Sequence, residues 1–130
     1  MVIDTSALLA ILQNEPERPA YNQTIELAER CALSTASFVE LSMVIESRYG
    51  PEGVRDLDLF LSRARVELIP VDTDQAYIAR LAFRRYGKGR HPAGLNFGDC
   101  FSYALAKSLG EPLLFKGEDF SQTDLTLAET

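Results

Sequence analysis

Four short apolar runs alternate along the chain with longer segments of helical periodicity, and this alternation constrains the fold more than any other feature. The runs predict buried strands at residues 2–3, 31–34, 66–71 and 112–115. The longer segments predict helices at residues 7–12, 19–29, 36–48, 52–65, 73–86 and 96–109. Strands separated by helices are typical of an α/β domain with a mainly parallel sheet. Residues 125–127 are a candidate edge strand.

Local signals mark several of the helix ends. Gly50-Pro51 predicts a stop after the helix at 36–48, because glycine favours a helix C-terminus and proline cannot continue the helix. Asp72 is expected to cap the helix that follows it, with Gln75 placed as in a capping box. Gly110 predicts the end of the last helix.

Size and composition are those of a single soluble globular domain, residues 1–130. The chain has 130 residues, of which 46% are hydrophobic and 25% charged, enough to build a hydrophobic core. No apolar stretch approaches the ~20 residues of a membrane span. Asp4 interrupts the first apolar run, which argues against a secretory signal. Cys31 and Cys100 are expected to be free and buried, and the expected location is cytoplasmic.

Charge is distributed unevenly along the chain. The net charge of −6 argues against a protein that binds nucleic acid by charge alone. Residues 75–98, however, contain no Asp or Glu and carry five positive charges, which leaves −11 on the remainder. These five cations are Arg80, Arg84, Arg85, Lys88 and Arg90. They indicate either a set of phosphate contacts or an ordinary solvated helix face and loop.

Two acidic residues follow predicted strands. Asp4 lies where the first strand gives way to a helix, and Asp119 lies in the polar loop after the last buried strand. The carboxyl ends of parallel strands form the edge at which α/β sheets bind ligands, so both are candidate site residues. Capping of the first helix is the simpler interpretation of Asp4.

Two further acids lie on helices. Glu40 shares a helical face with Met43 and Val44, so we expect it on an apolar face, where a charge is costly unless it is paired or bound to a metal. A buried ion pair is the alternative. Asp99 lies in the first turn of an apolar helix, where the helix dipole and reciprocal capping with Asn96 would favour an acid in any case.

Asp4, Glu40, Asp99 and Asp119 are together expected to bring carboxylates to one crevice. Crowded carboxylates repel one another and must share protons or hold cations. Oxygen ligands without Cys or His beside them suit Mg²⁺ or Mn²⁺. The single histidine, His91, belongs to the basic loop. Acid–base chemistry at this site would therefore come mostly from carboxylates and metal-activated water.

Five motifs extend over essentially the whole chain. They are Val2-Ile3-Asp4-Thr5-Ser6-Ala7, Ser37-Phe38-Val39-Glu40, Leu95-Asn96-Phe97-Gly98-Asp99-Cys100-Phe101, Ser102-Tyr103-Ala104-Leu105-Ala106 and residues 113–120. In this order and spacing they resemble the PIN-domain ribonucleases, specifically the VapC-type toxins of VapBC toxin–antitoxin modules. The resemblance implies a three-layer α/β/α domain whose mainly parallel central sheet has four to five strands.

The resemblance also implies roles for particular residues. Asp4 and Asp99 match the principal metal-binding acids, and Glu40 and Asp119 complete the acidic pocket as catalytic residues and metal ligands. The supporting positions are Thr5 or Ser6 beside the first acid, Asn96, and Thr123 in the tail. The family commonly has Asn before the final Asp, where this chain has Glu118, so the choice lies between Glu118 and Asp119, and Asp119 keeps the motif position.

The activity that the resemblance implies is Mg²⁺- or Mn²⁺-dependent cleavage of single-stranded RNA (tRNA, rRNA or mRNA), leaving a 5′-phosphate and a 3′-hydroxyl. The implied partners are an inhibitory VapB-type antitoxin and a second copy of the chain, in a homodimer and a toxin–antitoxin hetero-oligomer without a membrane. The helices at 36–48 and 52–65 are candidates for the groove that receives the antitoxin.

Other classes fit less well. Phosphatases of the haloacid-dehalogenase type need a second Asp two residues after Asp4, where this chain has Ser6. Receiver domains need an acid pair after the first strand and a phosphoacceptor on a middle strand, and neither is evident. The alternatives within the PIN fold are an RNA-processing nuclease without an antitoxin and a catalytically silent module that binds RNA or a partner.

Overall fold

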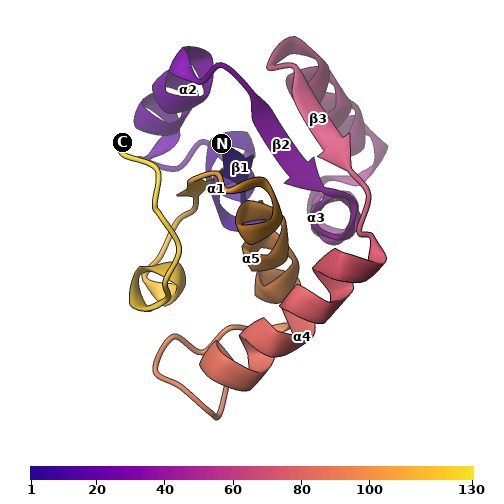
Figure 1. Ribbon diagram of the computed structural model, residues 1–130. Helices are drawn as coiled ribbons and strands as arrows, with labels where there is room; N and C mark the ends of the chain where they lie inside the picture. The colour runs from indigo at the N-terminus through magenta and orange to yellow at the C-terminus, as the bar shows by residue number, and fades with distance from the viewer.

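The computed structural model describes residues 1–130, and its strands and helices follow the predicted alternation (Figure 1). In chain order the elements are β1 (Val2–Ile3), α1 (Thr5–Leu12), α2 (Arg18–Leu27), β2 (Cys31–Ser34), α3 (Thr35–Arg63), β3 (Val66–Ile69), α4 (Thr73–Tyr86), α5 (Phe97–Leu109), β4 (Leu113–Leu114) and the 3₁₀ helix η1 (Asp119–Gln122).

The strands form one four-stranded sheet in the order β3-β2-β1-β4, and every neighbouring pair is parallel. Val2 of β1 lies opposite Ala32 of β2 on one side and Leu113 of β4 on the other. β1 is therefore an inner strand, and its carboxyl end lies between the ends of β2 and β4. This arrangement confirms the expected α/β class with a parallel sheet.

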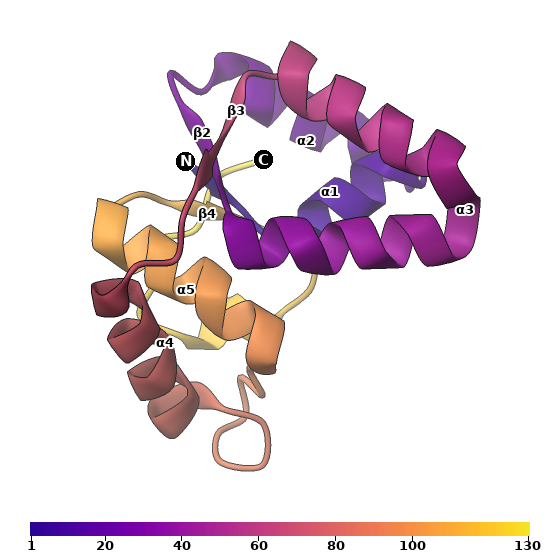
Figure 2. The ribbon, with the colours of Figure 1, turned by 90° about the vertical axis from the view of Figure 1, so that its right-hand side faces the viewer.

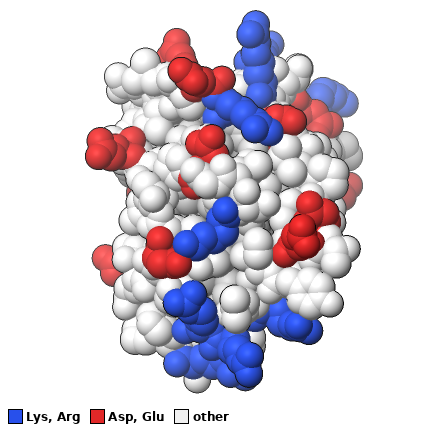
Figure 3. Space-filling model, viewed as in Figure 1, with Lys and Arg blue, Asp and Glu red and all other residues white.

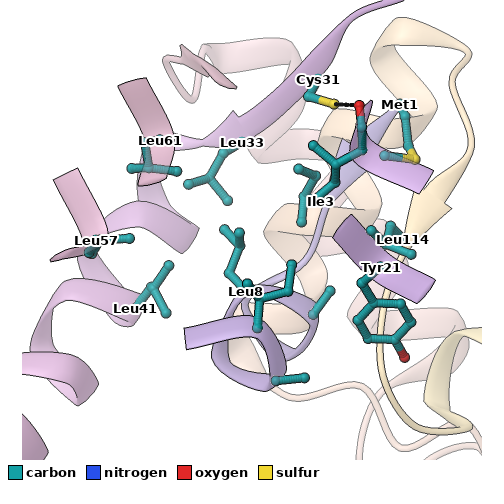
Figure 4. Packing of buried hydrophobic residues seen from close by; sticks show 14 of the residues in the cluster. Met1, Ile3, Leu8, Tyr21, Cys31, Leu33, Leu41, Leu57, Leu61 and Leu114 are labelled. Atoms are coloured by element: carbon teal, nitrogen blue, oxygen red, sulfur yellow. Dashed lines mark hydrogen bonds between the residues drawn. The ribbon is translucent and has the colours of Figure 1, made fainter. Parts of the chain in front are cut away.

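Helices cover both faces of the sheet (Figure 2). Successive strand residues point to opposite faces, so Ile3 packs with α1, α2 and α3, whereas Val2 packs with α4 and α5. Figure 4 shows the first of these cores, where Leu8 of α1 and Leu41 of α3 lie around Ile3. Phe120 of η1 belongs to the second core. The three-layer architecture is thus confirmed.

Helix α3 consists of two arms that meet at a sharp bend. Gly50 has φ 68° and ψ −160°, outside the helical region, and Pro51 follows it. Glycine reaches positive φ without the steric cost that a side chain would bring. The second arm turns back along the first (Figure 2). The predicted helix stop is therefore confirmed: the helix ends at Gly50, and a second helical arm starts in another direction.

Two local expectations were wrong. Residues 125–127 do not form a strand, because the tail pairs only through an isolated bridge between Leu127 and Leu113, and β4 is itself two residues long. At the start of α4, Asp72 accepts a hydrogen bond from the Gln75 N–H at 2.8 Å, as expected. The Gln75 side chain, however, donates to the Pro70 carbonyl at 3.1 Å, so the reciprocal half of the capping box is not formed.

The remaining expectations from composition concern the cysteines and the membrane. Cys31 and Cys100 are both buried and free, as expected. Burial raises the pKa of the Cys100 thiol to about 11, which keeps it protonated near neutral pH. No helix combines the length and the apolar character that crossing a membrane requires.

Candidate active site

Asp4 lies at the junction of β1 and α1 and is held on both sides. Its backbone N–H donates to the Leu114 carbonyl of β4 at 2.9 Å. Its Oδ2 accepts hydrogen bonds from the Ser6 N–H at 3.0 Å and the Ser6 hydroxyl at 2.7 Å, and its Oδ1 accepts from the Ser102 hydroxyl at 2.5 Å. Only 4% of Asp4 is exposed. Asp4 therefore caps α1 through the Ser6 N–H, and the hydroxyl of Ser102 on α5 also holds its side chain.

Ser102 and Ser37 are buried hydroxyls that the sequence analysis missed. Their Oγ atoms lie 3.3 Å apart, so a chain of hydroxyls joins α3, α5 and Asp4. The available signal was position, because Ser102 follows Asp99 by three residues and Ser37 precedes Glu40 by three. Residues at this spacing lie on one helical face. Each serine therefore lies on the same side of its helix as a predicted acid.

Ser6, rather than Thr5, is the hydroxyl that contacts the first acid. The Ser6 Oγ also accepts the backbone N–H of Lys116 at 2.9 Å, which ties the loop after β4 to Asp4. The Thr5 hydroxyl instead donates to the Ser37 carbonyl at 3.5 Å. The alternative between the two positions is thus resolved by their contacts.

Glu40 is half-buried on the first arm of α3, beside the start of α5. A Cβ atom at Gly98 would collide with the Glu40 carboxylate, so this carboxylate lies directly over Gly98. The expected burial of its face was wrong: Met43 is 65% exposed, and the buried face carries Leu41 and Ile45. None of the ion pairs includes Glu40, so the alternative of a buried ion pair does not apply.

Asp99 forms the predicted capping box with Asn96. Its Oδ2 accepts the Asn96 N–H at 3.0 Å, and the Asn96 Oδ1 accepts the Asp99 N–H at 2.9 Å. Burial raises the pKa of the Asp99 carboxyl to about 7, and the negative charges of Asp4, Asp119 and Glu40 add to this rise against the opposing Asn96 N–H. The three other acids are thus close enough to disfavour ionisation of Asp99.

Asp119 is exposed at the first residue of η1. Below it, the Phe120 ring is buried and packs edge-on against Phe115, with the ring centroids 5.2 Å apart. The Thr123 hydroxyl donates to the Phe120 carbonyl at 2.7 Å, so Thr123 closes the turn that carries Asp119. Glu118 is also exposed.

The four acids form an oxygen-only donor set without a countercharge. Asp4, Glu40, Asp99 and Asp119 take part in none of the ion pairs, and the nearby Lys116 pairs with Glu15 and Glu17 instead. No three of the acidic side chains form a complete metal site as they stand. Carboxylate oxygens are the ligands of hard divalent cations, and the mutual repulsion felt by Asp99 favours a cation between them. The residues present therefore fit Mg²⁺ or Mn²⁺.

The five predicted cations lie at one end of the molecule. Arg80, Arg84 and Arg85 lie on α4, and Lys88 and Arg90 lie in the loop that leads to α5. All five are exposed, and none takes part in an ion pair. Figure 3 shows Lys and Arg side chains gathered at the lower end of the molecule. The charge asymmetry of the sequence is thus also an asymmetry of the surface.

A groove of about 770 Å³, half of whose lining residues are apolar, lies on the face of the sheet covered by α1, α2 and α3, between α1, α2 and the second arm of α3. Its apolar lining includes Ile11, Leu12, Ile25, Leu59 and Phe60. Of the two segments considered for the antitoxin, residues 52–65 line this groove through Asp56, Leu59, Phe60, Arg63, Ala64 and Arg65. The first arm of α3, residues 36–48, does not line it.

Comparisons with known proteins agree with this fold. Residues 1–125 match the PIN domain family. Ribonuclease VapC of Mycolicibacterium smegmatis is 61% identical over 125 residues, which cover 96% of this chain and 97% of that protein. Ribonuclease VapC30 of Mycobacterium tuberculosis is 58% identical over 125 residues, which cover 96% of this chain and 95% of that protein. The chain therefore belongs to the PIN-domain family and, within it, to the VapC ribonucleases.

Solved structures share the fold at lower sequence identity. VapC20 of Mycobacterium tuberculosis, described as a sarcin-ricin loop cleaving toxin, superimposes with a TM-score of 0.80 at 17% identity and covers 99% of this chain and 98% of that one. The DNA-bound VapBC of Salmonella typhimurium gives a TM-score of 0.73 at 23% identity and covers 98% of this chain and 95% of that one.

Proposed function

We propose that this protein is the toxin of a toxin–antitoxin module, an endoribonuclease that uses Mg²⁺ or Mn²⁺ to hydrolyse RNA phosphodiester bonds. The observation that carries the proposal is the group of four uncompensated carboxylates at the carboxyl edge of the sheet, one of which, Asp99, has a pKa raised to about 7. The ribonuclease names of relatives at 58% and 61% identity support RNA as the substrate.

The proposed roles of the four acids differ according to how firmly hydrogen bonds fix each carboxylate. Asp4 and Asp99 are the principal ligands, because hydrogen bonds fix the carboxylates of both. Glu40 and Asp119 complete the pocket, and Glu40 orients the attacking water by accepting a hydrogen bond from it. A bound divalent cation supplies stabilisation of charge on the phosphate oxygens and a lowered pKa of water. Ser6 and Ser102 keep the Asp4 oxygens in place while RNA binds.

The cations of α4 and its loop hold the RNA backbone near an acidic site that would otherwise repel it. Lys88 and Arg90 lie in the loop that runs into Asn96, three residues before Asp99. Arg84 and Arg85 lie in the last turn of α4. Such contacts release counterions from RNA, so binding weakens as salt rises.

A VapB-type antitoxin is the proposed inhibitor, and a DNA-bound VapBC assembly shares this fold. The groove between α1, α2 and the second arm of α3 combines apolar and charged lining residues, the character of a surface that receives an amphipathic segment. Self-association of the toxin and assembly with the antitoxin into a hetero-oligomer are part of the same proposal. An antitoxin that restores growth to cells expressing this chain would support it.

Cleavage of RNA by the purified protein in Mg²⁺, Mn²⁺ or chelator tests the activity. Asp4→Ala and Asp99→Ala should abolish metal-dependent cleavage while circular dichroism shows a folded protein. Asp58→Ala, an exposed acid on α3, is the matched control and should cleave as the wild type does. Cleavage that persists in chelator, or in either site variant, would refute the acidic metal site.

A further inference from the structure

A second groove, which we call the α4 groove, lies at the basic end of the molecule. It has a volume of about 680 Å³ and is lined by Tyr77, Arg80, Leu81, Phe83, Arg84 and Arg90. Its rings are open to solvent, because Tyr77 is 60% exposed and Phe83 is 41% exposed. Aromatic side chains are usually buried or nearly so. Here they are exposed among arginines that form no ion pair.

The arginines of this groove lie against its rings. The Arg80 Cζ is 4.9 Å from the centre of the Tyr77 ring, and the Arg90 Cζ is 5.3 Å from that of Phe83. Neither guanidinium forms an ion pair. A guanidinium held over a ring keeps its edge N–H groups available to phosphate oxygens while offering a flat face for stacking. Each pair therefore presents a flat surface together with a positive charge.

We propose that the α4 groove binds single-stranded RNA, with bases stacked on Tyr77 and Phe83 and phosphates contacted by Arg80, Arg84 and Arg90. Stacking platforms combined with a positive groove are what single-stranded nucleic acid requires. The proposal rests on the proposed function and extends it, because it assigns part of substrate binding to a surface outside the acidic edge.

The covalent path of the chain connects the two sites. The loop after α4 leads directly into Asn96 and the start of α5 (Figure 2). There Phe97, two residues before Asp99, is 72% exposed. An RNA strand that runs from the α4 groove along this loop would pass the exposed Phe97 ring before it reaches Asp99 and the other site acids.

Charge distinguishes RNA from a second copy of the chain as the occupant. Isologous dimers, in which the same patch meets itself, are by far the commonest oligomers. Such a dimer through the α4 groove would bring Arg80, Arg84 and Arg90 of one copy towards the same three of the other, and like charges at an interface are costly. RNA brings one negative charge per nucleotide.

Binding of a labelled single-stranded oligouridine in the inactive Asp99→Asn background tests the stacking. Tyr77→Ala and Phe83→Ala should each weaken binding by about fivefold to a hundredfold, the range found for base–aromatic stacking, and should leave the salt slope unchanged. Tyr49→Ala removes an exposed ring from α3 and is the matched control, expected to bind as the background does. An oligomer of abasic nucleotides should not distinguish Tyr77→Ala from the background.

The phosphate contacts are tested by the salt dependence of the same binding. Arg80→Gln with Arg90→Gln should lower the slope of log affinity against log salt by about 0.7 for each phosphate that is no longer neutralised. Arg55→Gln with Arg63→Gln, which removes two exposed charges from α3, should leave the slope unchanged.

Three results would overturn the proposal. The first is Tyr77→Ala and Phe83→Ala binding oligouridine as tightly as the background. The second is an equal weakening of binding to the abasic oligomer. The third is sedimentation showing that Tyr77→Ala turns a dimer into a monomer, which would assign the groove to a second copy. Metal-dependent cleavage by the otherwise unchanged chain is measured separately. The proposal for the α4 groove and the proposed nuclease activity can therefore be refuted independently of each other.

Discussion

The acidic edge of the sheet and the α4 groove are built in opposite ways. At the edge, Asp4 is 4% exposed and its oxygens accept hydrogen bonds from Ser6 and Ser102. In the groove, Arg80 and Arg90 are exposed and lie against the rings of neighbouring side chains. The main chain and the core fix the first region, whereas the second depends on side chains at the surface.

The electrostatic cost of gathering like charges is high at the acidic edge and low along α4. At the edge, burial and three like charges raise the pKa of Asp99 to about 7, so ionising all four acids opposes folding. Water and salt screen the cations of α4, whose repulsion therefore costs little. Changes at the edge should have large effects on metal binding, and changes along α4 should have graded effects on RNA binding.

The largest expected effect is that of pH on metal affinity. A divalent cation and a proton compete for Asp99, whose pKa is raised to about 7, so the apparent affinity for Mg²⁺ should fall about tenfold for each pH unit below 7. Between pH 7.5 and pH 5 the decrease should approach about a hundredfold by this relation. Isothermal titration with Mg²⁺ across this range measures it. An affinity that stays constant down to pH 5 would show that Asp99 is not a ligand.

The hydroxyl support of Asp4 should matter next. Ser102→Ala removes the hydrogen bond to Oδ1 and should weaken Mg²⁺ affinity by about tenfold to a hundredfold, as expected for residues that orient ligands. Thermal shift against Mg²⁺ concentration provides the measurement. Ser42→Ala is the matched control, because its hydroxyl bonds the Phe38 carbonyl within α3. Equal behaviour of the two variants would mean that Ser102 does not position Asp4.

Removing the charge of Asp99 should lower activity but raise the stability of the metal-free protein. The pKa of Asp99 rises from 3.8 to about 7 on folding, so the folded state binds the proton more tightly, and stability falls as pH rises between these values. Asp99→Asn keeps an acceptor for the Asn96 N–H and removes the charge. The variant should be more stable than the wild type by about 1–2 kcal/mol at pH 8 after solvent screening, with the difference shrinking towards pH 4.

Thermal unfolding in chelator at pH 8 and pH 4 measures this difference. Added Mg²⁺ should reverse the order, because it stabilises a protein that binds it. A variant that is less stable than the wild type at pH 8 would contradict the assignment of repulsion to this edge.

The fold and the positions of Asp4 and Asp119 could be predicted because they follow from the order and the ends of the strands. Asp4 and Asp119 follow strands β1 and β4, which pair in parallel, so their approach to one edge is a consequence of topology. Asp99 was identifiable from its place in the first turn of an apolar helix. These predictions need only the alternation of elements.

The rest depends on packing that periodicity does not determine. The first arm of α3 has apolar residues on two sides, and only the side with Leu41 and Ile45 meets the core, so the expected burial of Met43 beside Glu40 was wrong. Ser37 and Ser102 are small residues in buried helices and are indistinguishable from core positions until the helices are packed. The tail at 125–127 meets β4 only at Leu113, so the candidate strand is reduced to an isolated bridge.

A smaller effect is expected where the start of α5 meets Glu40. Gly98→Ala places a methyl group against the Glu40 carboxylate, the flexible end of a side chain that can move away. Folding should therefore be little affected, while cleavage falls by about tenfold, of the order expected for a misplaced acid–base group. Combining Gly98→Ala with Glu40→Gln separates the two effects. If the double variant is no slower than Glu40→Gln alone, Gly98 acts through Glu40, and an additive decrease would contradict this.

The smallest and most graded effect is expected on RNA binding, when cations at the basic end of the molecule are replaced. In the Asp99→Asn background, replacing Arg84, Arg85 and Lys88 by Ala should lower the slope of log affinity for RNA against log salt by about 0.7 for each phosphate that is no longer neutralised. The matched control removes three exposed cations from the region of α3 and β3: Arg55, Arg63 and Arg65. Because both triple variants change the net charge equally, only local contacts can separate them. An equal fall in slope for both would mean that RNA responds to the charge of the whole molecule, and the contrast between a localised acidic edge and a localised basic end would then fail.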